Sequence, residues 1–383
     1  MSADAPSPRG RPPLRVLCAP NAFRGSLGAG AAAAALAAGA RDAGAEARAV
    51  PMADGGDSTL DVLVAASPSA RVEGHRVCGP LSGRLVARLG WIDATTAVVE
   101  LAEASGLRRV RGRLDPLRAT SRGAGELIIR ALDGGARRIV VGLGGSACTD
   151  GGGGLLTALG ARLLDAHGRP LRPGGGALAE LDRAELGGLD PRLHRCRVEV
   201  AVDVDSPLLG ERGAAATFGP QKGATAAEVA RLTAGLQRLA DVLERDAGVP
   251  PQLRDLAGAG AAGGSGYGLA AAGATLLAGA SLVADVVRLD AAISGSDLVV
   301  TGEGRLDRQT TAGKAPMEVA LRAARRRVGC VAVAGEVTLI PAVFLRAISL
   351  AELARPGEDP RRVPRRLLRR AGTRIVREAA APG

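Results

Sequence analysis

The segment Leu14–Val50, LRVLCAPNAFRGSLGAGAAAAALAAGARDAGAEARAV, contains one complete strand–helix–strand unit. Leu14–Ala19 is a short apolar run that Pro20 ends, and Ala29–Arg41 is alanine-rich with strong helix propensity. Ala45–Val50 then predicts a second strand. Because strands joined through a helix run parallel, the unit predicts an α/β fold with functional residues at the carboxyl ends of its strands.

The pattern changes after residue 70 and returns near residue 298. The runs in between begin as short, partly alternating segments separated by Gly and Pro, as in antiparallel strands: Arg71–Val77, Gly83–Trp91 and Thr96–Glu100. Leu298–Thr301 then predicts a buried strand that leads into a loop at Gly302–Thr311. Since 383 residues suffice for two domains, we predict a parallel-sheet domain made from residues 14–70 and 292–383, with a mixed α/β domain, residues 71–291, inserted between them.

The net charge of +11 is concentrated at the C-terminal end of the chain. Arg322–Gly383 contains 14 arginines and 5 acidic residues. Aromatic residues make up 1% of the chain and none interrupts the basic run Arg361–Arg370, whereas single-stranded nucleic acids are bound by basic grooves with stacking aromatics. We therefore expect a solvated, arginine-rich helix face and no nucleic-acid partner.

Cysteine spacing and hydropathy argue against a disulfide-rich, zinc-binding, secreted or membrane protein. The five cysteines are scattered without a CxxC pair, which indicates neither a disulfide framework nor a zinc site. Leu256–Val283 is uncharged over 28 residues, but its eight glycines favour a glycine-rich loop and a buried helix over a membrane span. Residues 1–13 lack the apolar core of a signal peptide and are expected to form a disordered tail. We expect a cytoplasmic protein without a membrane partner.

Four segments, three of them glycine-rich, carry acidic residues directly after apolar strands. They are Asp54–Asp57 (DGGD), Gly142–Gly152 (GLGGSACTDGG), Asp203–Pro207 (DVDSP) and Thr301–Asp307 (TGEGRLD). Glycine lets backbone N–H groups approach an anion closely, and carboxylates hold the Mg²⁺ that accompanies a nucleotide. Four such segments at strand ends indicate phosphoryl transfer.

Each acidic segment also has a purely structural interpretation. Asp54, before two glycines, could only close a turn, and Asp150 could only cap the helix that follows it. Glu303 and Asp307 could form an ion-pair turn with the arginine between them. Asp203 follows a buried strand directly, which favours a functional role at that position.

The small number of lysines and the spacing of the histidines limit which side chains could take part in a reaction. Lys222 and Lys314 are the only lysines, so one interpretation is a role for the compact ammonium group, and the other is chance. The three histidines have no triad-like or metal-like spacing, so a proton acceptor would have to be a carboxylate. The sequence contains no Walker-type phosphate loop.

Six motifs, in order along the chain, resemble those of one enzyme family. Ala19–Ala29 is APNAFRGSLGA, Pro51–Thr59 is PMADGGDST and Gly144–Gly152 is GGSACTDGG. The others are Phe218–Thr225 (FGPQKGAT), Gly258–Gly264 (GAGAAGG) and Thr301–Thr310 (TGEGRLDRQT). Together they resemble the bacterial glycerate kinase family, of the type that makes 2-phosphoglycerate, whose first three motifs are APDSFKGSLSA, PMADGGEGT and GGSATNDGG.

The resemblance implies a fold and a reaction. The fold would be two α/β domains, one of them inserted into a flavodoxin-like parallel-sheet domain. The reaction would be ATP-dependent phosphorylation of D-glycerate, a small-molecule substrate, with Mg²⁺ as cofactor. Asp203 or Asp150 would accept the proton of the glycerate 2-hydroxyl group, and Arg24 with Ser26 would bind its carboxylate.

The resemblance also implies residues that hold the nucleotide. Glu303 or Asp54, together with Asp307, would hold Mg²⁺ directly or through water. The phosphates would contact the ammonium group of Lys222 and backbone amides of two glycine-rich segments, at Gly144, Gly145, Ser146, Gly302 and Gly304.

Several positions depart from the family pattern, among them Asp57 and Ser58 in the second motif, which replace Glu and Gly. Asn21 and Ala22 stand where the family has Asp and Ser, and Arg24 stands where it has Lys. Asn21 lacks a carboxylate, and the guanidinium of Arg24 is bulkier and bidentate. The alternative predictions are therefore a kinase for a related hydroxy acid, or a weakly active or non-catalytic descendant that binds a small acid or a nucleotide.

Overall fold

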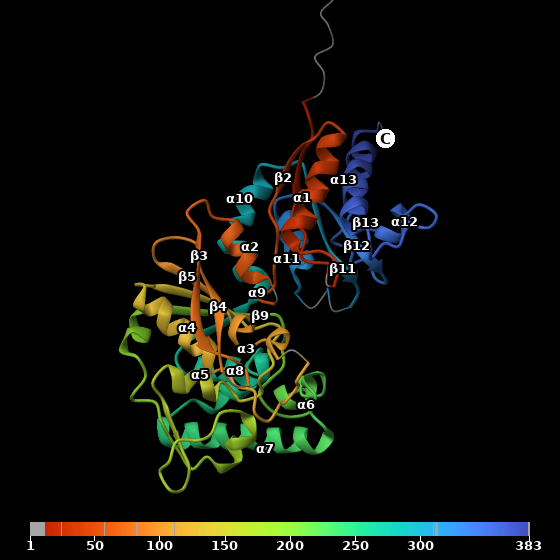
Figure 1. Cartoon of the computed structure of the whole chain (residues 1–383). Coiled ribbons are helices and arrows are strands. Elements are labelled where there is room, and N and C mark those ends of the chain that lie inside the picture. The colour runs from red at the N-terminus through yellow and green to blue at the C-terminus, as the bar shows by residue number, and fades with distance from the viewer. Residues whose placement is uncertain are drawn as a thin grey trace, which may run out of the picture. The chain divides into compact units, whose positions relative to one another are not determined.

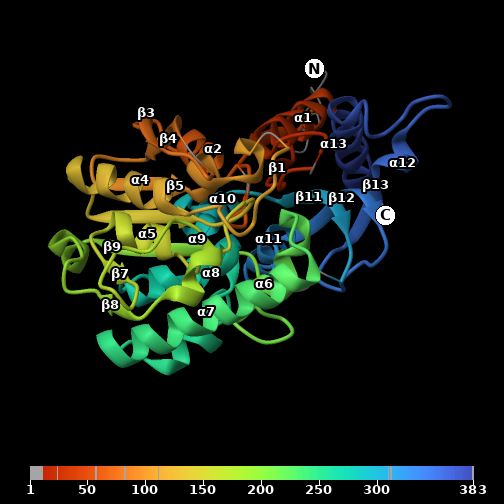
Figure 2. The same ribbon diagram turned by 60° about the horizontal axis from the view of Figure 1, so that its bottom comes forward.

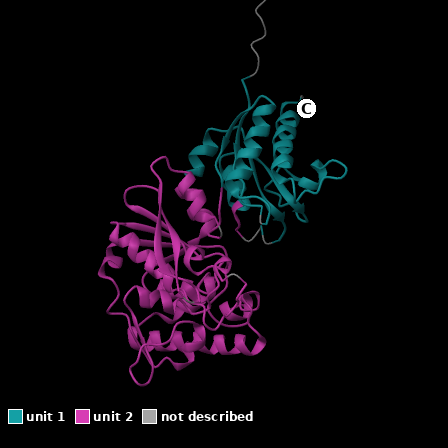
Figure 3. Ribbon diagram, viewed as in Figure 1, with its two compact units in different colours: residues 1–51, 288–312, 316–383 teal, residues 52–287, 313–315 magenta. Residues whose placement is uncertain are grey.

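The computed structural model describes residues 12–23, 25–56, 58–81, 83–110, 112–308, 310 and 313–381. The chain is mixed α/β and divides into two compact units (Figure 1, Figure 3). Unit 1 comprises residues 1–51, 288–312 and 316–383, and unit 2 comprises residues 52–287 and 313–315. Both ends of the chain therefore belong to one unit, and the middle of the chain forms the other.

Unit 1 is built on a five-stranded parallel sheet. Its strands are β1 (Arg15–Cys18), β2 (Glu46–Ala49), β11 (Leu298–Leu306), β12 (Gly329–Val337) and β13 (Arg346–Ser349), in the order β13-β12-β11-β1-β2. Counted along unit 1 alone, the order is 2-1-3-4-5, the doubly wound order found in flavodoxin. The predicted parallel sheet from both chain ends is confirmed.

Two helices, α1 (Ala29–Asp42) and α13 (Pro364–Ala380), lie side by side in unit 1, and Figure 2 shows the same pairing as Figure 1. A Cβ atom on Gly39 would lie 1.8 Å from the Arg369 carbonyl oxygen, so glycine is required for the close approach of the two backbones. Apolar side chains of both helices pack with sheet residues such as Val300. The other helices of the unit are α10 (Leu289–Ser294), α11 (Ala315–Arg325) and α12 (Leu350–Leu353).

Arginines of α13 pair with acidic side chains, and among these acids Glu358 has the most strongly lowered pKa. A hydrogen bond from Arg370, with a second from the Arg355 N–H group and the nearby charge of Arg366, lowers the pKa of Glu358 from 4.5 to about 2. Because its pKa is lower in the folded chain than in the unfolded chain, ionised Glu358 stabilises the fold above pH 4.5. That contribution is lost as the pH falls from 4.5 toward 2.

Glu358→Gln is therefore expected to lower the free energy of unfolding near neutral pH. The effect should be smaller at about pH 3, because wild-type Glu358 has lost part of its ion-pair energy there. Urea unfolding of both proteins across this range measures the difference. Glu336→Gln is the control, because that carboxylate is 58% exposed and lies 3.7 Å from its arginine partner. A Glu358→Gln effect that did not change with pH would contradict the prediction.

Unit 2 contains a six-stranded mixed sheet. Its strands are β3 (Arg71–Cys78), β4 (Arg84–Trp91), β5 (Thr96–Glu100), β6 (Arg138–Gly142), β9 (Arg197–Val202) and β10 (Thr275–Ala278), in the order β10-β9-β6-β5-β4-β3. The first three strands are antiparallel neighbours, as predicted, and β5, β6, β9 and β10 are parallel. Glu100 is paired with Gly142, and Gly142 with Ala201. The carboxyl ends of the parallel strands therefore lie along one edge.

Unit 2 also contains several α-helices. They are α2 (Thr59–Ala65), α3 (Leu101–Ser105), α4 (Arg122–Asp133), α5 (Gly153–Ala158), α6 (Ala214–Phe218), α7 (Ala226–Ala247), α8 (Ala261–Ala271) and α9 (Gly279–Val286), and β7 (Arg162–Leu164) pairs with β8 (Arg183–Glu185). Almost every residue of α8 is buried, so the glycine-rich segment does lead into a buried helix. Within the described residues, no helix combines the length and the apolar character that crossing a bilayer requires.

The borders between the two units differ from the predicted domain borders. Residues 52–70 belong to unit 2, whereas the sequence analysis grouped them with the chain ends. The reason is that α2 packs on the unit 2 sheet: the Leu60 N–H group donates to the Glu100 carboxylate at 3.2 Å, and Gly90 leaves space for the side chains of Leu60 and Val64. A change in strand pattern does not reveal which sheet a preceding helix covers.

Candidate functional site

The carboxyl edge of the unit 2 sheet brings together glycine-rich segments that are far apart in the chain. A Cβ atom on Gly55 would lie 2.4 Å from the Ala201 carbonyl oxygen, so the segment Asp54–Gly56 crosses the end of β9. The Gly144 N–H group, just beyond β6, donates to the Gly55 carbonyl group at 3.1 Å. The Asp54–Gly56 segment therefore spans the ends of two neighbouring parallel strands.

Two predicted acidic residues lie on the segments that meet there. Asp54 is 5% exposed, and its backbone carbonyl group packs against Gly279 at the start of α9. Asp203 is half-buried and directly follows β9. Three of the four predicted acidic segments, those of Asp54, Gly144 and Asp203, thus meet at one edge of one sheet.

The turn after β6 is fixed by backbone hydrogen bonds. Gly145 is exposed and has a φ of 71°, which glycine adopts without strain. The Gly145 carbonyl group accepts from the Leu107 N–H group at 2.9 Å, and the Ala147 N–H group donates to the Ser105 carbonyl group at 2.8 Å. Among the described residues, the N–H groups of Gly145 and Ser146 have no acceptor, whereas that of Gly144 is used by Gly55. Two of the three predicted amides are therefore without an acceptor in the described part of the chain, that of the exposed Gly145 and that of Ser146, which is 6% exposed.

Lys222 supports this turn from inside the protein. It ends the short helix Pro220–Lys222, is 2% exposed, and donates to the Ser146 hydroxyl group at 3.0 Å and to the Cys148 carbonyl group. Burial lowers the pKa of Lys222, and the nearby Cys148 and Asp150 act in the opposite direction. The predicted ammonium group thus lies beneath the Gly145–Ser146 turn and is covered from solvent.

Asp150 is a buried acceptor at the start of α5. It is 1% exposed, and its Oδ2 atom accepts from the Ser121 N–H group at 2.8 Å, the Ser121 hydroxyl group at 2.9 Å, and Thr120 and Gly154 at 3.2 Å each. Its Oδ1 atom accepts from the Gly152 N–H group at 3.3 Å. Of the two interpretations of Asp150, these contacts favour the structural one, although the N-cap residue of α5 is Gly152.

We therefore expect Asp150→Asn to reduce the stability of the fold more than the rate of catalysis. The amide cannot accept hydrogen bonds at both of its terminal atoms, so buried donors lose their partner, and we expect the free energy of unfolding to fall by about 2–3 kcal/mol. Urea unfolding measures this change. The exposed Asp133→Asn is the control, since Asp133 is 44% exposed. Equal stability of the two variants would show that Asp150 is not the structural acceptor described here.

The remaining predicted acids belong to unit 1. Glu303 is 6% exposed and accepts from the Thr310 hydroxyl group at 2.6 Å, and the Asp307 N–H group donates to the same hydroxyl oxygen at 3.1 Å. Asp307 also lies 3.5 Å from Arg305, as the ion-pair interpretation expected. Within the described residues, no group of three or more His, Cys, Asp or Glu side chains is arranged to hold a metal ion.

The segment around Glu303 differs from its predicted conformation. The loop expected at Gly302–Thr311 is strand as far as Leu306, because β11 remains paired with β12 up to the pair Leu306–Val337. A Cβ atom on Gly302 would lie 2.0 Å from the Val333 carbonyl oxygen. The predicted phosphate contacts Gly302 and Gly304 therefore lie in a sheet, and Gly302 serves close strand packing.

The predicted carboxylate-binding residues precede α1 in unit 1. Ser26 is exposed, and its hydroxyl group donates to the Phe23 carbonyl group at 2.9 Å. The N-cap residue of α1 is Gly28, two residues beyond Ser26. Arg24 lies outside the described residues.

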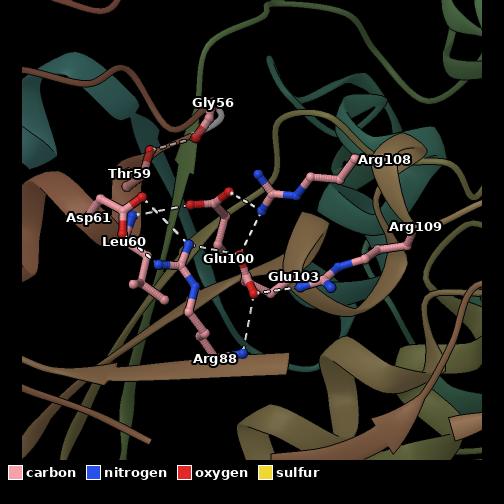
Figure 4. A network of polar contacts seen from close by, with 9 residues as sticks. All are labelled: Gly56, Thr59, Leu60, Asp61, Arg88, Glu100, Glu103, Arg108 and Arg109. Carbon is pink, nitrogen blue, oxygen red and sulfur yellow. Dashed lines mark hydrogen bonds and ion pairs between the residues drawn. The ribbon is translucent and has the colours of Figure 1, made fainter. Parts of the chain in front are cut away.

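The sequence analysis missed a polar network in unit 2 (Figure 4). Glu100, at the end of β5, and Glu103, in α3, are 1% and 2% exposed. The Arg108 Nη2 atom donates to both carboxylates, at 3.3 Å and 2.6 Å. Glu103 also accepts from Arg88 and Arg109. Glu100 carries the signal used for the other acids, an acidic residue directly after a buried strand, but no glycine follows it.

Comparisons with known proteins agree on one family. The family model described as the glycerate kinase family matches residues 16–380. The chain is 44% identical to a glycerate kinase of Bacillus subtilis over 91% of this chain and 92% of that protein, and 43% identical to a glycerate 2-kinase of Escherichia coli over 85% and 86%. A crystal structure of a Salmonella typhimurium LT2 protein assigned as a glycerate kinase 2 superposes with a TM-score of 0.85 at 40% identity, covering 96% of this chain and 98% of that one.

Proposed function

The chain belongs to the glycerate kinase family and is a kinase, and from that premise we propose that it transfers the γ-phosphoryl group of ATP to the 2-hydroxyl group of D-glycerate. The products would be 2-phosphoglycerate and ADP. The observation that carries this proposal is the meeting of the Asp54, Gly144 and Asp203 segments at the carboxyl edge of the unit 2 sheet. Ligands of doubly wound α/β proteins bind outside the carboxyl ends of parallel strands.

We assign the role of general base to Asp203. It directly follows β9 and is half-buried, so its carboxylate can be reached by a substrate hydroxyl group. Asp150 is the weaker choice because one of its oxygens accepts from four donors inside the protein. Asp203 would take the proton of the 2-hydroxyl group as the oxygen attacks the γ-phosphorus atom.

The proposed nucleotide contacts lie at the same carboxyl edge of the unit 2 sheet. The N–H groups of Gly145 and Ser146 would bind phosphate oxygens, and Lys222 would hold this turn in place. Asp54 supplies the hard oxygen ligand that Mg²⁺ prefers, and one or two carboxylates suffice because phosphate oxygens and water complete its shell. When bound, Mg²⁺ neutralises charge that develops on the phosphates.

The residues of unit 1 enter the proposal through the family resemblance. Glu303 and Asp307 are proposed metal contacts, and Arg24 and Ser26 are proposed contacts of the glycerate carboxylate. Gly302 and Gly304 are kept as proposed phosphate contacts. We further propose that unit 1 is flavodoxin-like, with unit 2 as its insertion, and that the enzyme works on a small metabolite in the cytoplasm, without nucleic acid.

A coupled assay of ADP release with D-glycerate, L-glycerate and other 2-hydroxy acids tests the proposed function. We expect D-glycerate to give the highest kcat/KM and removal of Mg²⁺ by chelation to abolish turnover. Asn21, which is 8% exposed and stands where the family has Asp, is the reason to include the other acids. A higher kcat/KM for another acid would establish the related-substrate alternative, and the absence of turnover with every acid would establish the non-catalytic one.

A further inference from the structure

Arg108 is an exposed arginine whose guanidinium group is held by two buried carboxylates. It lies in the short helix Leu107–Arg109, and its Nη2 atom donates to Glu100 and Glu103, which are almost fully buried. The Arg108 side chain nevertheless remains 46% exposed. Figure 4 shows its guanidinium group directed at the two carboxylates, with every dashed line drawn to one nitrogen.

The backbone of this segment is attached to the Gly145–Ser146 turn. The Leu107 N–H group donates to the Gly145 carbonyl group at 2.9 Å, and Gly106 and Ser146 form an antiparallel bridge. Arg108 is therefore held at a fixed position next to a turn whose two N–H groups have no acceptor among the described residues.

The neighbouring arginines are engaged differently. Arg88 donates to Glu103 through one nitrogen and to the exposed Asp61 through another, so both ends of its guanidinium group are bound to protein. Arg109 donates to Glu103, and its Nε atom is buried without a partner. Three guanidinium groups thus contact Glu103, and Glu100 and Asp61 bring the number of carboxylates in this network to three as well.

We propose that Arg108 binds an anionic oxygen group of a substrate, a phosphate of the nucleotide or the carboxylate of the hydroxy acid, beside the Gly145–Ser146 turn. This inference rests on the proposed function. Guanidinium groups present several donors in one plane, and those not used by Glu100 and Glu103 match a carboxylate or a phosphate. Because the anchor already fixes the Arg108 side chain, little side-chain entropy is lost when the anion binds.

Steady-state kinetics of Arg108→Ala and Arg108→Lys test the inference. We expect Arg108→Ala to raise the KM of one substrate by roughly 10- to 100-fold, the value of a charge-assisted hydrogen bond. Arg108→Lys should recover part of the loss, because it keeps the charge without the planar fork. Arg88→Ala is the matched control, since Arg88 also contacts Glu103 and is 39% exposed, and its KM values should not change.

The substrate affected identifies the ligand. A higher KM for ATP alone indicates phosphate binding, and a higher KM for glycerate alone indicates carboxylate binding. Unchanged KM values for both substrates in the two Arg108 variants would overturn the inference and leave the kinase assignment intact. If the wild-type protein has no turnover, the proposed function fails on its own. The role of Arg108 is then decided by calorimetry, which measures the binding of ADP and of D-glycerate to the wild type and to Arg108→Lys. Equal affinities in that comparison, or no binding, would overturn it.

Discussion

Asp203→Asn is expected to lower kcat by about 10²- to 10⁴-fold while the KM values for ATP and glycerate change little. The amide has the shape of the carboxylate but cannot accept a proton at neutral pH. Removing the base therefore affects the transition state, in which the proton moves, more than ground-state binding. Initial rates of ADP release at saturating substrate measure kcat directly.

Asp205→Asn is the matched control for this prediction. Asp205 lies two residues beyond Asp203 in the same segment, is 81% exposed, and pairs with Arg212 at 3.0 Å. Its removal changes the charge of the segment by the same amount, so kcat should remain near the wild-type value. A normal kcat in Asp203→Asn, or an equal loss in both variants, would refute the assignment of Asp203 as the base.

Gly55→Ala is expected to lower kcat/KM by about 100-fold, because displacement of a positioned group by about 1 Å has an effect of that size. The new Cβ atom would lie 2.4 Å from the Ala201 carbonyl oxygen, so the Asp54–Gly56 segment must move away from the end of β9. Gly55 also has a φ of 92°, and a side chain there costs about 1–2 kcal/mol of stability. Activity and urea unfolding are both needed to separate the two effects.

Gly135→Ala separates the backbone effect from the displacement. Gly135 has a φ of 84°, close to that of Gly55, but a Cβ atom there would have no neighbour within 4 Å. We expect this variant to lose similar stability from its backbone conformation and to keep its kcat/KM. If Gly55→Ala were as active as Gly135→Ala, the contact between the Asp54–Gly56 segment and β9 would not matter for activity.

Several elements could be predicted from the sequence because local and tertiary preferences agree there. The alanine-rich run and the two apolar runs of residues 14–50 form α1, β1 and β2 within a few residues of the expected borders. β11 is the clearest exception, since Gly302 and Gly304 suggested a loop. A glycine that allows two strands to approach closely has the same sequence pattern as a glycine that opens a turn, and only the position of Val333 separates the two.

The detailed roles of the candidate site residues depend on contacts between distant segments. Asp150 accepts from Ser121, and Lys222 donates to Ser146, 76 residues away in the chain. Sequence analysis could identify these side chains as unusual but could not distinguish a buried partner from a ligand contact. Arg108 was missed because one arginine among 48 has no distinguishing pattern until Glu100 and Glu103 are seen to hold it.

The most direct test of the central claim is the phosphorus NMR spectrum of a reaction mixture that contains the wild-type protein, Mg-ATP and D-glycerate. The proposed function predicts that a resonance of 2-phosphoglycerate grows in step with ADP. Appearance of 3-phosphoglycerate instead would contradict the assigned hydroxyl group. ATP that stays intact, with no phosphorylated glycerate, would contradict the claim that this sheet edge transfers a phosphoryl group to D-glycerate.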